Sequence, residues 1–139
     1  MDFKPRNMAQ LMPYMIVREA QASVSFYEKA FGFKLQNLVK DDNGQIIHVE
    51  MTKDDFVVMF APESADPKKK SPVHLGVTMP VNMYVYCQDT DVMYQQAIQN
   101  GAQSLIKPHD AFWGDRFCSV LDPDHYEWCF ATLLPQPTP

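Results

Sequence analysis

Two stretches of this chain repeat the same spacing of predicted elements. Gly32, a glycine suited to end a helix, follows Tyr14 by 18 positions, and Gly101 follows Met83 by the same 18 positions. Each stretch opens with an apolar run that predicts a strand and continues with a helical pattern. The two stretches share few identical residues, but a repeated spacing of this kind indicates an internal duplication. We therefore expect two copies of one structural unit.

The first copy is predicted to have the element order βαβββ. Its helix is expected over residues 20–31, because Val24, Tyr27 and Phe31 recur at helical spacing along one face. Its strands are predicted over residues 11–17, 33–39, 45–51 and 56–60.

A proline-containing segment with three consecutive lysines separates the two copies, and it is long for an ordinary loop. The second copy repeats the order βαβββ, with a helix predicted over residues 90–100 and a final hairpin within residues 111–132. The predicted organisation is a single domain, with a first module at residues 10–61, a linker at 62–81, a second module at 82–134 and a flexible tail at 135–139.

Length and composition favour one globular domain in a reducing compartment. The 139 residues are 46% hydrophobic, which is enough to bury a core without disulfides. Three cysteines, with no C-x-x-C spacing and no signal peptide, suit the cytoplasm. A net charge of −5 argues against nucleic acid as a partner. No apolar run approaches the roughly 18 residues that indicate a membrane span.

Two turns in the first module set its expected register. Asn43-Gly44 tolerates the positive φ angles of a type I′ hairpin turn. A two-residue loop at Lys53-Asp54 would place His48 opposite Met59, and Glu50 on the same face of the sheet. These side chains are therefore expected to point into one cavity.

The last hairpin contains a second short turn that sets an expected register. A two-residue loop at Pro123-Asp124 would place Cys118 opposite Cys129 and would turn Arg116 to the same face. The two cysteines are then expected to be close enough for mild oxidation to crosslink them.

Short motifs along the chain occur in an order that is typical of one superfamily. The first module carries Ala22–Tyr27, Phe31–Phe33 and Ile47–Met51, and the second carries Asn100–Ala102, Trp113–Arg116, Asp122-Pro123, Trp128 and Ala131-Thr132. Together they resemble the vicinal oxygen chelate superfamily of glyoxalases, bleomycin-resistance proteins and dioxygenases, and its PhnB-like branch in particular. The resemblance implies an α+β fold in which two tandem βαβββ modules form a cupped mixed sheet.

The turn that follows Asp122-Pro123 departs from the pattern of that branch. Where the branch has glycine and then histidine, this chain has His125 and Tyr126. Such a glycine commonly takes a positive φ, which histidine tolerates better than most residues. We therefore expect the chain to form the same turn, with local backbone strain at His125.

Four positions correspond to the metal ligands of metal-dependent members. The resemblance places them at Met12, Met59, Asn82 and Cys129, and the first and second pairs lie 70 positions apart in the repeat. A divalent ion of the family type needs imidazole or carboxylate donors, and none of the four residues supplies one. We therefore expect neither a metal nor another cofactor.

Side chains that point into the cup are expected to form a ligand pocket. His48 and Glu50 could be an acid–base pair, a hydrogen-bonded pair at the pocket wall, or part of an atypical metal site. Aromatic rings there could stack on a flat ligand or serve packing, and Arg116 with Asp115 could fix the polar end of a ligand or hold their own loop. The predicted ligand-binding residues are Tyr14, Met59, Asn82, Tyr84, Tyr86, Phe112, Trp113, Arg116, Cys118, Glu127 and Cys129.

The favoured function is metal-independent binding of a small, partly aromatic molecule by a cytoplasmic homodimer, as in resistance-type members of the superfamily. Two alternatives stay open. One is a metal-dependent lyase, isomerase or dioxygenase that uses His48 and Glu50. The other is a vestigial interaction module whose cup is filled by its own side chains.

Overall fold

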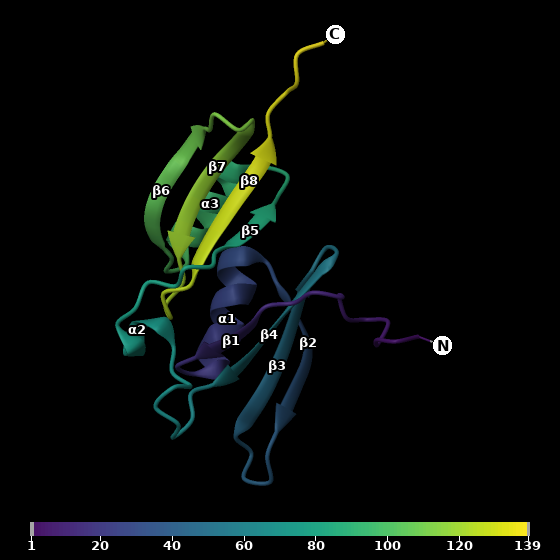
Figure 1. Cartoon of the computed structure of the whole chain (residues 1–139), viewed down its shortest axis with the longest axis vertical. Helices are drawn as coiled ribbons and strands as arrows, with labels where there is room; N and C mark the ends of the chain where they lie inside the picture. Colours follow the sequence, from purple (N-terminus) through teal and green to yellow (C-terminus); the bar gives the residue numbers. More distant parts are fainter. Residues whose placement is uncertain (1, 139) are drawn as a thin grey trace.

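The fold consists of two four-stranded mixed sheets, each with one long helix (Figure 1). The structure is a computed structural model that describes residues 2–138, so Met1 and Pro139, the outermost residues of the expected lead and tail, lie outside it. The first sheet has the strand order β1-β4-β3-β2 and the second has the order β5-β8-β7-β6. The predicted α+β class and the two βαβββ units are confirmed.

The elements follow the predicted order, except that the predicted linker contains one short helix that was not predicted. They are β1 (Tyr14–Val17), α1 (Ala20–Phe31), β2 (Lys34–Lys40), β3 (Ile46–Lys53), β4 (Phe56–Pro62), α2 (Pro72–Leu75), β5 (Met83–Tyr86), α3 (Thr90–Gln99), β6 (Gln103–Asp110), β7 (Asp115–Leu121) and β8 (Glu127–Leu133). Gly32 ends α1 with a φ of +74°, the left-handed conformation predicted for it. No helix within residues 2–138 is long and apolar enough to cross a membrane.

The two modules repeat the same strand pairing. Strand β1 runs parallel to β4 with Tyr14 beside Met59, and β5 runs parallel to β8 with Tyr84 beside Cys129. Each residue of the second pair lies 70 positions after its counterpart, so the spacing in the sequence reflects a repeated register.

Helix α1 joins the two modules into one core. It packs against α3 and against its own sheet. The ring of Tyr27 lies 5.6 Å from that of Phe60 in the first sheet and 5.5 Å from that of Trp128 in the second. Truncating a buried aromatic such as Trp128 to alanine costs about 3–5 kcal/mol. Each sheet thus buries one face against the helices, and we call the opposite face of each sheet its open face.

The β2–β3 turn differs from the type I′ turn predicted at Asn43-Gly44. Gly44 has a φ of +79°, whereas Asn43 does not take a positive φ. The N–H of Gly44 donates to the C=O of Asp41 at 3.0 Å. This arrangement is a type I turn followed by a left-handed glycine, as in three-residue hairpin loops. The predicted hairpin is confirmed and its predicted turn type is wrong.

The β3–β4 hairpin is shifted by two residues from the prediction. Lys53 faces Phe56, so the loop is Asp54-Asp55, and Glu50 rather than His48 corresponds to Met59. Side chains alternate between faces with a period of two, so a shift of two returns each one to its predicted face. His48, Glu50 and Met59 therefore share the open face of the first sheet.

The β7–β8 hairpin is shifted by one residue, which reverses the facing of β7. Cys118 faces Phe130, and Ser119 takes the place opposite Cys129. The predicted pairing of Cys118 with Cys129 is wrong, and so is the predicted inward orientation of Arg116 and Cys118.

The physical reason for this shift lies in the turn itself. His125 takes the left-handed conformation, with a φ of +71°, and adds a third residue to the loop. The carboxylate of Asp122 accepts the N–H groups of Asp124 and Tyr126 at 3.0 and 2.9 Å, which holds the longer loop. The expected positive φ at His125 is confirmed.

Candidate functional site

A chain of three polar side chains crosses the open face of the first sheet. Tyr14 on β1 and His48 and Glu50 on β3 reach this face by strand alternation, while Val49 and Met51 point into the core. The Oη of Tyr14 lies 2.9 Å from Nδ1 of His48, and Nε2 of His48 lies 2.8 Å from the Glu50 carboxylate. The structure thus joins the predicted pair to Tyr14.

The direction of these hydrogen bonds follows from the chemistry of the carboxylate. The hydrogen bond from His48 lowers the pKa of Glu50 below its ordinary value, so this carboxylate is ionised at neutral pH and only accepts. Nε2 of His48 must then carry a proton. In the neutral ring Nδ1 is an acceptor, and the phenol of Tyr14 donates to it.

The open face of the second sheet carries an aromatic platform, which we define as Tyr84, Tyr86, Trp113 and Phe117. The phenols of Tyr84 and Tyr86 donate to the same carboxylate oxygen of Asp115, at 2.6 and 2.8 Å. The indole N–H of Trp113 donates to the Tyr84 oxygen at 2.8 Å. The ring of Phe117 stacks on Tyr84 at 5.8 Å. The rings are therefore held in fixed orientations.

Electrostatics reinforce this arrangement. Burial, together with the hydrogen bond to Asp115, raises the pKa of Tyr84 to about 12. The hydrogen bond from Tyr84 is the largest influence that lowers the pKa of Asp115. At neutral pH the carboxylate is ionised and the phenols stay protonated as donors.

A groove of about 640 Å³ runs between the two sheets, next to this platform. Its volume lies in the usual range for small-molecule sites. It is lined by Leu11, Met12, Pro13, Asp54, Asp55, Phe56, Val57, Val58, Val81, Met83, Tyr84, Val85, Tyr86 and Trp128. Smaller hollows lie elsewhere, such as one of about 200 Å³ beside Arg18 and Asp124, which lacks the aromatic lining.

Most of the predicted ligand-binding residues lie on the two open faces. Met59 lies beside Tyr14 on the first sheet. On the second, Cys129 lies beside Tyr84, and Glu127 accepts a hydrogen bond from Ser119 at 2.6 Å. Asn82 is exposed just before β5.

Phe112 is 98% exposed, the most exposed of the predicted aromatic residues. Its ring lies 5.0 Å from that of Trp113, at a nearly perpendicular angle. It stands at the rim of the platform, where a ligand or a second molecule could cover it.

Arg116 and Cys118 lie on the buried side of the second sheet instead. The Arg116 guanidinium forms ion pairs with Asp91 on α3 at 3.0 Å and with Asp110 at 3.2 Å. Cys118 is fully buried, and burial raises the pKa of its thiol to about 12. Neither side chain reaches a ligand on the open face.

Sequence reasoning missed Phe117, and it considered Asp115 only together with Arg116, as a pair that could fix the polar end of a ligand or hold its own loop. The one-residue shift of β7 brings them to the open face in place of Arg116 and Cys118. The positive φ expected at His125 is compatible with a longer loop, but it does not by itself fix the loop length.

The sequence and the fold resemble those of known proteins. Residues 8–130 match the family model described as the Glyoxalase/Bleomycin resistance protein/Dioxygenase superfamily. The chain belongs to this superfamily. It is 32% identical over 121 residues to the uncharacterized protein Mb0911c of Mycobacterium bovis, a match that covers 85% of this chain and 79% of that protein.

Solved structures of other proteins share the fold. TioX from Micromonospora sp. ML1 has a TM-score of 0.68 at 20% identity, over 91% of this chain and 99% of its own. A PhnB protein from Bacillus cereus has a TM-score of 0.65 at 12% identity, over 89% of this chain and 99% of its own. The PhnB protein is thus among the structural neighbours.

The metal site of metal-dependent superfamily members does not fit this chain. Met12, Met59, Asn82 and Cys129 offer thioether, amide and thiol groups, which are poor donors for a hard or borderline divalent ion. Across the described part of the chain, no group of three His, Cys, Asp or Glu side chains is placed to hold a metal ion. We therefore derive no chemistry through a metal.

Proposed function

We propose that this superfamily member binds a small, partly aromatic molecule without a metal, in the groove between its two sheets. The observation that carries the proposal is the pair of tyrosines on β5. Tyr84 and Tyr86 line the groove and are held by a single carboxylate oxygen of Asp115. Rings fixed before binding lose little conformational entropy when a ligand arrives.

The exposure of these rings supports a binding role. Tyr84 is 44% exposed and Tyr86 is 60% exposed, although each is hydrogen-bonded. Contiguous exposed apolar surface on a soluble protein commonly marks a binding site. A flat ligand that covers the rings would gain hydrophobic burial together with ring stacking.

The groove also bears on the vestigial alternative. A module that had lost its ligand would be expected to fill the cup with its own side chains. The open volume of about 640 Å³ favours a binding protein instead. The metal-dependent enzyme lacks a supporting observation, because the donor set does not fit.

We further propose that the protein works as a homodimer in the cytoplasm. The N-terminal segment leaves the body of the molecule before β1 (Figure 1), and it carries Phe3, which is 82% exposed, and Leu11, which is 91% exposed. A second copy could cover these side chains together with the open faces. All three cysteines are free thiols, which agrees with a reducing compartment.

The binding proposal is tested with flat aromatic probes on protein dialysed against a chelator. A thermal-shift and calorimetric series with 2-naphthol and 2-tetralone should show stabilisation and saturable binding, because a ligand that binds the native state stabilises it. Tyr84→Ala should weaken binding about 10-fold or more, in line with the loss of a stacking contact of about 1.5 kcal/mol.

Tyr94→Phe provides the matched control. Tyr94 on α3 donates its phenol to Ser104 at 2.7 Å and does not line the groove. This variant should bind both probes as the wild type does. Absence of saturable binding by the wild type, or equal weakening by the two substitutions, would overturn the proposal.

A further inference from the structure

We propose that the groove between the sheets selects a cationic ligand, namely an aromatic ring system that carries a protonated amine. This inference rests on the proposed function, because it names the charge of the molecule that the groove binds. It is carried by the hydrogen-bonding capacity of the side chains that line the groove. The charge and the aromatic rings of the same lining agree with it.

Among the described residues that line the groove, every side chain with a hydrogen-bond donor already uses it. The donors are the phenols of Tyr84 and Tyr86 and the indole of Trp128. Both phenols donate to Asp115, at 2.6 and 2.8 Å. The indole N–H donates to Asp122 at 2.9 Å. Each of these groups has a single proton to donate, so no side chain of the lining can donate to a ligand without breaking one of these bonds.

Acceptors remain open along the same lining. Asp54 and Asp55 form the exposed β3–β4 turn, and both line the groove. Neither carboxylate takes part in an ion pair within residues 2–138. The phenol oxygen of Tyr86 has lone pairs besides the proton that it donates, so it can also accept. A ligand group that donates hydrogen bonds therefore matches these side chains, whereas a group that only accepts does not.

The charge of the lining is negative. It includes Asp54 and Asp55, and no lysine, arginine or histidine is among the described residues that line the groove. Two lysines near this turn are engaged or placed elsewhere. Lys53 donates to the C=O of Phe31 at 2.9 Å, and Lys34 lies on β2, which β3 separates from β4. A positive charge in the groove is therefore attracted and a negative one is repelled.

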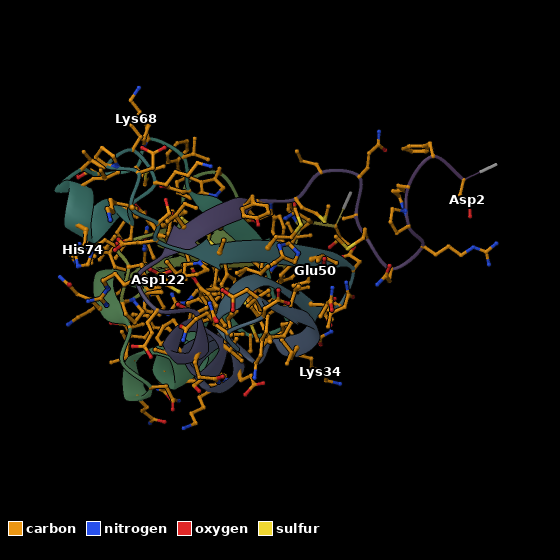
Figure 2. The ribbon with its side chains drawn as sticks, turned by 90° about the horizontal axis from the view of Figure 1, so that it is seen from below. Asp2, Lys34, Glu50, Lys68, His74 and Asp122 are labelled. Carbon is orange, nitrogen blue, oxygen red and sulfur yellow. The ribbon has the colours of Figure 1, made fainter. Side chains whose placement is uncertain are left out.

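The three consecutive lysines of the chain lie away from the groove. Lys68, Lys69 and Lys70 belong to the linker between the modules. Figure 2 shows Lys68 on the side of the molecule opposite to that from which the N-terminal segment leaves. The end of that segment lines the groove through Met12 and Pro13. A ligand in the groove would therefore lie near the aspartates of the lining rather than near these lysines.

The tyrosine rings favour a cation as well. A cation over the face of an aromatic ring is attracted by the quadrupole of the ring. The phenols of Tyr84 and Tyr86 donate to the carboxylate of Asp115, which shifts electron density toward both rings and makes their faces more negative. Both rings are exposed enough for a ligand to reach them. An aromatic amine could thus stack its ring on one tyrosine and place its charge near the other or near the aspartates.

The test compares three probes that share one ring system and differ in charge: 2-naphthylmethylamine, 2-naphthylmethanol and 2-naphthoate. Calorimetry at neutral pH on chelator-dialysed protein should show the amine binding about 10-fold more tightly than the alcohol. A cation–π contact and an exposed ion pair together account for about that factor. The carboxylate should bind most weakly. The advantage of the amine should shrink at high salt, which screens the charges.

Substitutions in two hairpin turns separate a local contact from the net charge of the protein. Asp54→Asn and Asp55→Asn should each weaken binding of the amine about threefold and leave binding of the alcohol within about twofold. Asparagine tolerates the φ of +50° at Asp54, so the turn is kept.

Asp42→Asn is the matched control for these variants. Asp42 is an exposed aspartate in the β2–β3 turn, which lies at the other end of the first sheet (Figure 1) and does not line the groove. The substitution changes the net charge by the same amount. This variant should bind the amine as the wild type does.

Three outcomes would overturn the inference. If the alcohol binds as tightly as the amine, the groove does not select a cation, although the proposed binding function stands. If the amine keeps the same advantage in Asp54→Asn, Asp55→Asn and Asp42→Asn, that advantage stems from the net charge of −5 rather than from the groove. If none of the three probes binds, the proposed function fails and the inference fails with it.

Discussion

The phenol of Tyr126 closes the free edge of β1 at Ile16. Its oxygen accepts the backbone N–H of Ile16 at 3.0 Å and donates to the C=O of the same residue at 2.8 Å. Strand β1 pairs with β4 on its other side only, so this edge would otherwise have unpaired backbone groups. A side chain of the second module thus completes a strand of the first.

Tyr126→Phe should therefore destabilise the protein although it keeps the ring. The substitution leaves the N–H and C=O of Ile16 without their partner, and an unsatisfied buried pair of this kind costs about 1–3 kcal/mol. Urea unfolding followed by circular dichroism measures the loss. Tyr94→Phe, which removes an exposed phenol from α3, should cost less than about 1 kcal/mol, and an equal cost for both variants would contradict the edge-closing role.

Asp122 makes the stability depend on pH. It accepts hydrogen bonds from the Tyr27 phenol at 2.5 Å and the Trp128 indole at 2.9 Å, yet burial outweighs them and raises its pKa to about 6. The folded protein therefore holds this proton more tightly than the unfolded chain does. The resulting stabilisation is fully present below the ordinary Asp pKa near 4 and is lost as the pH rises through about 6.

Asp122→Asn should remove this pH dependence while keeping the side-chain shape. The free energy of unfolding of the wild type, relative to that of the variant, should fall by about 2–3 kcal/mol between pH 4 and pH 7.5. Urea titrations at four pH values measure the difference. A difference that rises with pH would show that the hydrogen bonds outweigh burial instead.

The cysteines provide a direct test of the β7–β8 register. Cys118 and Cys129 are buried on opposite faces of the second sheet, and burial raises their pKa values to about 12 and about 11. Cys87 is partly exposed. Iodoacetamide should therefore modify Cys87 first in the folded protein, as measured by mass spectrometry of tryptic peptides.

The same samples should resist intramolecular crosslinking. Mild oxidation should not join Cys118 to Cys129, because side chains on opposite faces cannot meet the geometry of a disulfide. If a peptide crosslinked through Cys118 and Cys129 were recovered from folded protein, it would support the predicted two-residue loop at Pro123-Asp124 and contradict the three-residue loop of the structure.

The sequence predicted the architecture well because its signals are local. The helical face of α1 and its glycine C-cap depend on residues close together in the chain, and the 70-residue repeat presents the same local spacing a second time. The face of the sheet on which each side chain lies was harder to predict. In the β3–β4 hairpin an error of two positions left Glu50 on its correct face, whereas an error of one in the β7–β8 hairpin exchanged Asp115 for Arg116.

The Tyr14–His48 contact was beyond the reach of sequence reasoning for another reason. The contact joins β1 to β3 across β4. Whether two side chains meet over an intervening strand depends on their rotamers, and the spacing of residues in the sequence does not determine rotamers. The same is true of Asp115, whose two tyrosine partners come from a strand about 30 positions earlier in the chain.

Asp115→Asn should loosen the aromatic platform and weaken ligand binding. The amide cannot match a carboxylate that accepts two phenols at one oxygen, and hydrogen bonds to charged groups contribute about 1.5–3 kcal/mol each. The pKa of Tyr84, raised to about 12 beside the carboxylate, should fall in the variant. Ultraviolet titration of tyrosinate measures this fall, and calorimetry with 2-naphthol should show binding weakened about 10-fold.

Arg116→Ala is the control for that experiment. Its guanidinium is the neighbour of Asp115 in sequence but pairs with Asp91 and Asp110 on the other side of the sheet. The loss of these partly exposed pairs should cost no more than about 1 kcal/mol of stability and should leave naphthol affinity unchanged. If Arg116→Ala weakened binding more than Asp115→Asn did, the orientation originally predicted for β7 would be the correct one, and the platform would have to be assigned to the other face.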